Sequence, residues 1–245
     1  MPPRIVVFKS GSDLVHGAAT AMVDLLHDAA LRRGSAAIAL SGGSTPRSVY
    51  ELLATDQFRG KVDWNTTHLF WGDERCVPPN APDSNYRMVK ESLLDKVPVP
   101  STNIHRAKGE LLPVEAAHQY EDEIRKHFGS ATPAFDLLLL GIGEDGHTAS
   151  LFPGTAALSE RSRVVTEVFV PKLNAHRVTL TFPVINNAGR VVILVSGKTK
   201  ASIVREILEV RPGKYPSEQV SPTSGSLYWY LDADAASMLS EVEPV

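Results

Sequence analysis

The sequence predicts an α/β fold, with a Rossmann-like open, mostly parallel sheet that carries helices on both faces. Short apolar runs alternate with segments in which apolar residues recur at helical spacing, a pattern typical of parallel sheets. Several of these runs are apolar throughout, as strands buried on both faces are. Three of them lead directly into clusters rich in glycine or in charge. Because loops that leave the carboxyl ends of parallel strands converge on one crevice, we expect these clusters to meet.

The first half of the chain contains three expected strand–helix units. Each expected strand is a short apolar run, and apolar residues three or four positions apart follow it. Gly34 ends the first helix, and Pro46 suits the first turn of the second, with Ser44 or Thr45 as its cap. The expected strands are Ile5–Phe8, Ala36–Leu40 and Thr67–Trp71, and the expected helices are Leu14–Ala29, Pro46–Leu53 and, after a proline-rich loop at Cys76–Asp83, Asn85–Lys96.

The second half continues the alternation and ends on a further strand. The segment Arg211–Gly225 is rich in proline, glycine and serine, and too little chain follows it for a second domain, so we expect a surface loop. A single domain over residues 1–245 is therefore predicted. The expected strands are a short one at Ile104, then Phe135–Leu140, Val164–Val170, Val178–Phe182, Arg190–Val195 and Leu227–Leu231, and the expected helices are Pro113–Phe128 and Lys198–Val210.

Composition limits the classes of partner. A net charge of −3 and a pI near 6.2 provide no basic field for nucleic acid, so local donors must hold any anionic substrate. No apolar stretch reaches the roughly 18 residues that a membrane-spanning helix needs, and the N-terminus lacks the pattern of a signal peptide. We expect a cytoplasmic protein, monomeric or weakly homo-oligomeric, that binds no membrane. The single cysteine, Cys76, excludes an internal disulfide and is expected to be a packing residue.

The turn after the second expected strand has the features of a phosphate cradle. Gly42 and Gly43 let the backbone approach a ligand closely, and the helix that follows offers unpaired N–H groups and its positive dipole end. Ser44 and Thr45 add hydroxyl donors. A plain capped turn would show the same residues, but the lysine-bearing turn at Ser196–Lys200 favours a bound anion, since lysines in a first helical turn oppose the dipole. Neither turn matches a P-loop motif.

The glycines at positions 141, 143 and 146 match a dinucleotide-binding fingerprint after a strand. In that motif the glycines open a long helix, whereas this segment meets Pro153-Gly154 within a few residues. It also places acidic side chains where a pyrophosphate would need backbone donors. We therefore interpret the match as coincidental and expect no dinucleotide.

His147 is the candidate general base, because it sits in a glycine-flanked turn at a strand end and imidazole accepts protons near neutral pH. Asp145, Glu144 or Asp73 could orient its ring, and the sequence leaves the choice open. Arg75 could stabilise an oxyanion or bind phosphate, or pair structurally with a neighbouring carboxylate. A metal site formed by these groups is disfavoured, because no spaced His–His or Cys pattern is present.

Six motifs, taken in order, resemble the 6-phosphogluconolactonase family, which is related to glucosamine-6-phosphate isomerases. The resemblance implies an α/β fold and cofactor-free, metal-independent hydrolysis of 6-phospho-D-glucono-1,5-lactone. It implies that Gly43, Ser44, Thr45, Arg177 and Lys200 hold the phosphate, that His147 is the general base and that Arg75 is a substrate-binding cation. The motifs are Ser41–Pro46, Trp71–Arg75, Asp83–Tyr86, Gly141–Pro153, Arg177 within His176–Thr181, and Ser196–Ala201.

Two rival functions remain open at this stage. The resemblance implies that aminosugar-phosphate isomerases or deaminases of the same family have the sequence Asp-Glu-Tyr, with tyrosine where Arg75 stands here. It also implies that they carry a catalytic glutamate where this chain has Phe152 before Pro153. Both departures disfavour ring opening and isomerisation. A non-catalytic sugar-phosphate sensor would keep the cradle but would not need His147 beside acidic residues.

Overall fold

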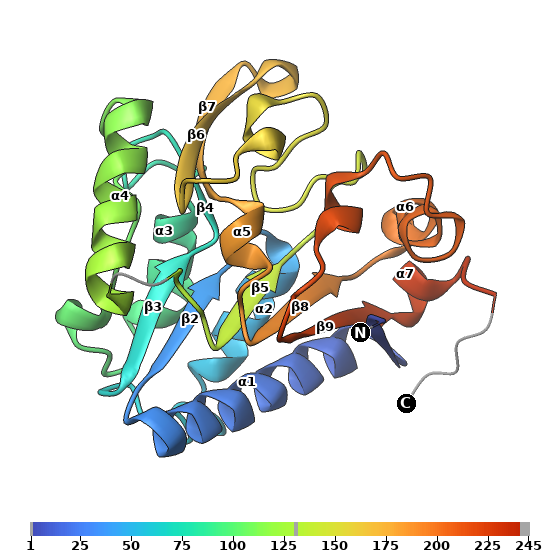
Figure 1. Cartoon of the computed structure of the whole chain (residues 1–245). Coiled ribbons are helices and arrows are strands. Elements are labelled where there is room, and N and C mark those ends of the chain that lie inside the picture. Colours follow the sequence, from blue (N-terminus) through green and yellow to red (C-terminus); the bar gives the residue numbers. More distant parts are fainter. Residues whose placement is uncertain (1, 130–131, 241–245) are drawn as a thin grey trace.

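A six-stranded parallel sheet forms the centre of the computed structural model, which describes residues 2–129 and 132–240 (Figure 1). Its strand order is β1-β9-β8-β5-β2-β3, and every neighbouring pair is parallel. The predicted α/β fold is confirmed. The strands are β1 Arg4–Phe8, β2 Ala36–Leu40, β3 Thr67–Trp71, β5 Leu137–Leu140, β8 Arg190–Val195 and β9 Ser226–Asp232.

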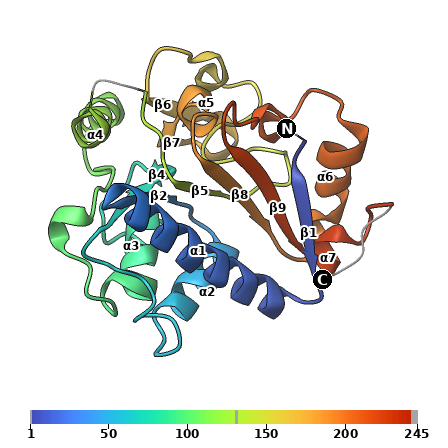
Figure 2. The same ribbon diagram turned by 60° about the horizontal axis from the view of Figure 1, so that its bottom comes forward.

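Helices cover both faces of this sheet, as predicted. Alternate residues of each strand point to opposite faces, and they enter two separate apolar clusters. Leu137 and Leu139 pack with α1, α2 and α3, whereas Leu138 and Leu140 pack with α4, α5, α6 and α7. Figure 2 shows α1 and α2 lying together across the first of these faces. The helices are α1 Gly11–Arg33, α2 Ser44–Leu53, α3 Asn85–Val89, α4 Pro113–Phe128, α5 Phe182–Ile185, α6 Ala201–Arg205 and α7 Ala233–Ala236.

A second sheet of three antiparallel strands departs from the sequence prediction. Its order is β4-β7-β6, with β4 at Asp73–Arg75, β6 at Val165–Val170 and β7 at Ala175–Leu180. The runs Val164–Val170 and Val178–Phe182 were expected to extend the alternating pattern, but they pair through the short turn at Pro171–Asn174. A turn that short joins antiparallel neighbours, because parallel strands need a longer crossover. In Figure 1 this sheet lies above the larger one.

Four predicted elements differ from the structure in type or in limits. The helix expected at Asn85–Lys96 is α3 followed by a π-helical turn at Lys90–Leu94, and the one at Lys198–Val210 contains 3₁₀, α and π turns in succession. Ile104 forms a single parallel bridge with Leu69 instead of a strand. Phe182 begins α5 instead of ending a strand. The loops Cys76–Asp83 and Arg211–Gly225 are confirmed as irregular, the latter with one 3₁₀ turn.

The strand order creates a switch point between β2 and β5. From β2 the chain moves outward to the edge strand β3, whereas β5 lies on the other side of β2 and leads on to β8 and β9. In open parallel sheets, ligands bind outside the carboxyl ends of the strands at such a point. No helix of the described residues is both long enough and apolar enough to cross a membrane. The single-domain organisation stays a prediction.

Candidate active site

A cleft of about 330 Å³ opens at the carboxyl ends of three adjacent strands, β2, β5 and β8. The turns after these strands form its walls, and β4 contributes a fourth side. This volume is in the range of small-molecule sites. The cleft therefore unites the clusters that the sequence singled out. Of the predicted site residues, its lining includes Gly42, Gly43, Ser44, Thr45, Asp73, Arg75, His147 and Lys200.

The first wall is the N-terminus of α2. Gly43 occupies the cap position and no side chain caps the helix, so the predicted capping role of Ser44 or Thr45 is wrong. The helix begins at Ser44 itself, and the N–H groups of Ser44 and Thr45 therefore lack intrahelical acceptors. Gly42 packs against Asn85, and a Cβ there would lie 2.1 Å from the Asn85 Oδ1. The uncapped N–H groups of this turn are therefore available to an anion.

The turn after β8 brings Lys200 to the cleft. The buried carboxylate of Asp232 fixes this turn by accepting hydrogen bonds from the Ser196 hydroxyl and from the Gly197 N–H, the latter at 3.0 Å. The same carboxylate accepts from the Ala235 N–H at 2.8 Å and so caps α7. Within residues 2–129 and 132–240, no carboxylate forms an ion pair with Lys200. Its ammonium remains available to a ligand.

The turn after β5 holds His147 against Asp145. The His147 Nδ1 lies 2.5 Å from the Asp145 Oδ1, which resolves the choice of carboxylate that the sequence left open. Asp145 also forms an ion pair with Lys172 at 3.1 Å. Burial raises the pKa of Asp145, but hydrogen bonds from His147 and Lys172 outweigh this effect and lower the pKa to about 2. The carboxylate is therefore charged at neutral pH and holds Nδ1 protonated, which leaves Nε2 as the proton acceptor.

Two neighbours fix the position of the His147 ring. Phe152 stacks on it, with ring centroids 3.9 Å apart and an interplanar angle of 20°. Gly143 lies beneath the pair, where a Cβ would approach the His147 Nδ1 to 2.0 Å and the Asp145 Oδ1 to 2.7 Å. The position of the imidazole therefore leaves no room for a side chain at Gly143, the second glycine of the apparent dinucleotide fingerprint. No helix occurs in Gly141–Thr155, all of which the structure describes, so these glycines do not open the long helix of a dinucleotide-binding motif.

The acidic pair on β4 supports the site instead of orienting His147. Asp73 accepts hydrogen bonds from the Ser150 hydroxyl at 2.6 Å and from the Asn85 amide at 3.2 Å. Glu74 accepts from the backbone N–H groups of Arg75, Asn85 and Tyr86. Burial raises the pKa of Glu74 despite these bonds. Both carboxylates tie the loop after β4 to the cleft wall.

Arg75 and Arg177 face each other across the β4–β7 ladder. The Nε atoms of both are buried without a hydrogen-bond partner among the described residues. Burial, together with the charge of Arg75, lowers the pKa of Arg177. Arg75 lines the main cleft, but Arg177 lines only a neighbouring cavity, which it shares with Arg75 and Cys76. Like charges opposite each other destabilise a ladder, so this pair favours an anion between them.

Several supporting residues were not predicted. Asn85, Ser150 and Ser196 contribute to the cleft or to its walls, and Asp232 fixes the turn that carries Lys200. Asn85 lies in the Asp83–Tyr86 motif, which was a usable signal, whereas Asp232 ends a strand far along the chain. Cys76 packs against the apolar core, and burial raises the pKa of its thiol to about 11, as expected for a packing residue.

The chain is similar to known proteins in both sequence and structure. The family described as glucosamine-6-phosphate isomerases/6-phosphogluconolactonase matches residues 9–229. A curated 6-phosphogluconolactonase from Synechocystis is 41% identical, and the match covers 98% of this chain and 99% of that protein. One from Nostoc is 38% identical, with 98% and 100% covered. The solved structure of a 6-phosphogluconolactonase from Trypanosoma cruzi has a TM-score of 0.87 at 31% identity, and covers 98% of this chain and 99% of its own.

Proposed function

The chain belongs to the family of glucosamine-6-phosphate isomerases and 6-phosphogluconolactonases, and from this premise we propose that it hydrolyses 6-phospho-D-glucono-1,5-lactone to 6-phosphogluconate. This is the second step of the oxidative pentose phosphate pathway. The relatives that match nearly the whole chain carry the lactonase name. One observation within the chain carries the proposal: His147, held by Asp145 behind it, lines the same cleft as the uncapped α2 N-terminus.

The phosphate of the substrate binds at the α2 end of the cleft. The N–H groups of Ser44 and Thr45 and the ammonium of Lys200 are its donors, since a helix N-terminus and a free cation both favour an anion. Arg177, opposite Arg75 on the β4–β7 ladder, adds positive charge from the neighbouring cavity. With the phosphate anchored there, the lactone ring extends toward His147.

The reaction uses His147 as general base. Its Nε2 takes a proton from a water molecule, and the resulting hydroxide attacks the lactone carbonyl carbon. Arg75 or backbone N–H groups stabilise the tetrahedral oxyanion. The oxyanion then collapses, the bond from that carbon to the ring oxygen breaks, and the ring oxygen takes the proton from the imidazolium. That transfer regenerates the base without a covalent intermediate, and the open-chain acid ionises to its carboxylate by releasing a proton to solvent.

Asp145 positions the base and does not touch the substrate. Its charge holds the Nδ1–H form of His147 and stabilises the imidazolium that forms after proton transfer. Phe152 keeps the ring in plane by stacking. The amino-sugar enzymes of the family are expected to have a glutamate where Phe152 stands. An apolar ring supplies no proton to a substrate, and this favours lactone hydrolysis over isomerisation.

Proton release from freshly generated lactone, measured against its spontaneous hydrolysis, tests this function. We expect the purified protein to accelerate release far above the spontaneous rate, and to produce no ammonia from glucosamine 6-phosphate. Ammonia formation without lactone hydrolysis would assign the chain to the other branch of the family. Binding of 6-phosphogluconate without either reaction would identify a sensor.

A further inference from the structure

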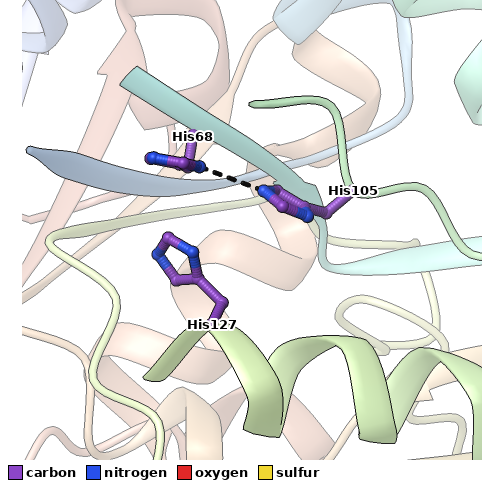
Figure 3. A group of neighbouring side chains, drawn as sticks. All are labelled: His68, His105 and His127. Atoms are coloured by element: carbon purple, nitrogen blue, oxygen red, sulfur yellow. Dashed lines mark hydrogen bonds between the residues drawn. The ribbon is translucent and has the colours of Figure 1, made fainter. Parts of the chain in front are cut away.

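Three histidines from separate segments converge at the edge of the large sheet, outside the cleft. His68 lies on β3, His105 follows the bridge at Ile104, and His127 lies in the last turn of α4. Figure 3 shows their three rings directed toward one another. His68 is in the amino half of β3, three residues before Trp71, hence roughly 10 Å from the strand end that leads to the cleft. The proposed reaction uses none of them.

The ring nitrogens are close enough together to share one ion. One nitrogen from each histidine can be chosen so that all three lie within 4.8 Å of one another, and the His68 Nδ1 is 3.1 Å from the His105 Nε2. Two nitrogens bound to one tetrahedral zinc ion at ~2.0–2.1 Å lie about 3.3 Å apart. Small ring rotations therefore suffice to bring all three nitrogens to ligating distance. The rings of His68 and His127 already have centroids 4.4 Å apart.

Glu123 supplies the outer support that ligating histidines commonly have. Its Oε1 lies 2.9 Å from the His105 Nδ1, so this nitrogen donates to the carboxylate and directs the Nε2 lone pair toward the cluster. Carboxylate–histidine–metal arrangements fix ring orientation and raise ligand basicity in this way. Glu123 is one helical turn before His127 on α4, so one helix supplies both a ligand and the outer partner.

The surroundings of the cluster favour a bound cation. The C-terminal end of α4 carries negative dipole charge, which stabilises a cation. A cavity beside the cluster, lined by His105, Asp122, Glu123 and His127 among others, gives access and room for a fourth ligand.

We propose that His68, His105 and His127 bind one zinc ion, with water or a cavity carboxylate in the fourth position. Imidazole suits zinc and similar late transition ions, whereas Mg²⁺ and Ca²⁺ prefer oxygen ligands. The ion joins the edge strand β3, the chain after Ile104 and the end of α4. Its role is structural, because it lies away from the cleft and ties together segments that are distant in sequence.

Isothermal titration of the metal-stripped full-length protein with ZnCl₂ tests the site. We expect one equivalent to bind, with MgCl₂ giving no binding. At zinc concentrations about 100-fold above Kd, the Tm rises by roughly 5–10 °C. His127→Gln should weaken zinc binding about 100-fold or more, and Glu123→Gln about 10-fold. His27→Gln, the same change at an exposed histidine of α1, is the matched control and should bind zinc as the wild type does.

His127→Phe keeps the aromatic packing and removes the ligand, so it separates the two roles. Loss of zinc binding in this variant, with retention in His147→Ala, supports the proposal. Three results overturn it: no zinc binding by the wild type, unchanged affinity in His127→Phe, or loss of binding in His147→Ala alone. The last result would place the ion in the cleft.

Discussion

Two histidine sites in this chain use the same side chain in contrasting surroundings. His147 has one carboxylate partner and one open nitrogen at a cleft, whereas His68, His105 and His127 direct nitrogens at one another. Both sites place an aromatic ring against imidazole, since Phe152 stacks on His147 and Phe70 on His105. The stacking therefore does not distinguish them. The groups around the ring nitrogens therefore decide whether an imidazole transfers a proton or binds a metal ion.

Removal of the imidazole at each site gives the sharpest test of this contrast. His147→Ala removes the general base, so kcat should fall about 10²–10⁴-fold while KM changes little. His127→Phe removes a ring from the other site and should leave kcat and KM near wild-type values. Steady-state lactonase assays on both variants measure this. Comparable losses in the two variants would mean that the sites are not separate.

Gly143 tests whether the position of His147, and not only its presence, sets the rate. A Cβ at this residue would overlap the imidazole, because it would lie 2.0 Å from Nδ1. A displacement of about 1 Å in a catalytic group costs about 10²-fold, so Gly143→Ala should lower kcat by that order. Gly60→Ala, where an added Cβ meets nothing within 4 Å, is the control. A fully active, normally stable Gly143→Ala enzyme would contradict the geometry described.

The cations Lys200, in the cleft, and Arg177, in the neighbouring cavity, should affect binding and not the chemical step. Lys200→Ala and Arg177→Ala each remove a charge proposed to attract the phosphate, and KM should rise roughly 10–100-fold with kcat little changed. Lys198→Ala lies in the same turn at an exposed position and should leave KM unaltered. Initial-rate kinetics and inhibition by inorganic phosphate report the effect. An equal rise in KM in the Lys198 and Lys200 variants would contradict the assignment of Lys200 to phosphate binding.

The Asp145 carboxylate predicts a modest dependence of stability on pH. Its pKa is about 2 in the folded protein against an ordinary value of 3.8, so the carboxylate stabilises the fold above about pH 4. This contribution is lost as the pH falls from 4 to 2. Asp145→Asn should lower the free energy of unfolding at neutral pH, and the difference should disappear near pH 2. Urea titrations at several pH values measure it, with Asp28→Asn, at an exposed position of α1, as the control.

The sequence predicted the six parallel strands because each contains a short apolar run between turn residues, although polar residues begin some of them, as Thr67 and His68 begin β3. The sequence did not predict the second sheet, because its strand β4 lacks such a clear pattern. Asp73–Arg75 is charged and follows a strand end, so it resembles a loop, yet it pairs with β7. The parallel strands depend on burial, which leaves an apolar pattern, whereas β4 depends on a partner far along the chain.

The candidate site was predictable where one short segment carried the whole signal. The Gly42–Thr45 turn and His147 are of this kind, and the structure places both in one cleft. Contacts between distant segments were not predictable, as with Ser150 on Asp73 or Asp232 on the Lys200 turn. The three-histidine cluster is of the second kind. Its members are 37 and 22 residues apart, since they stand at positions 68, 105 and 127, and that spacing matches no metal-binding motif.

The hairpin formed by β6 and β7 carries two of the charges that surround the site. Lys172, in its turn, pairs with Asp145, and Arg177, on its second strand, faces Arg75. The base and the helix N-terminus come from turns of the six-stranded sheet, not from this ribbon. Substitutions confined to the ribbon therefore change the charge around the cleft without replacing the base or the helix N-terminus. The same ribbon is a defined segment for exchange between relatives when an altered substrate range is wanted.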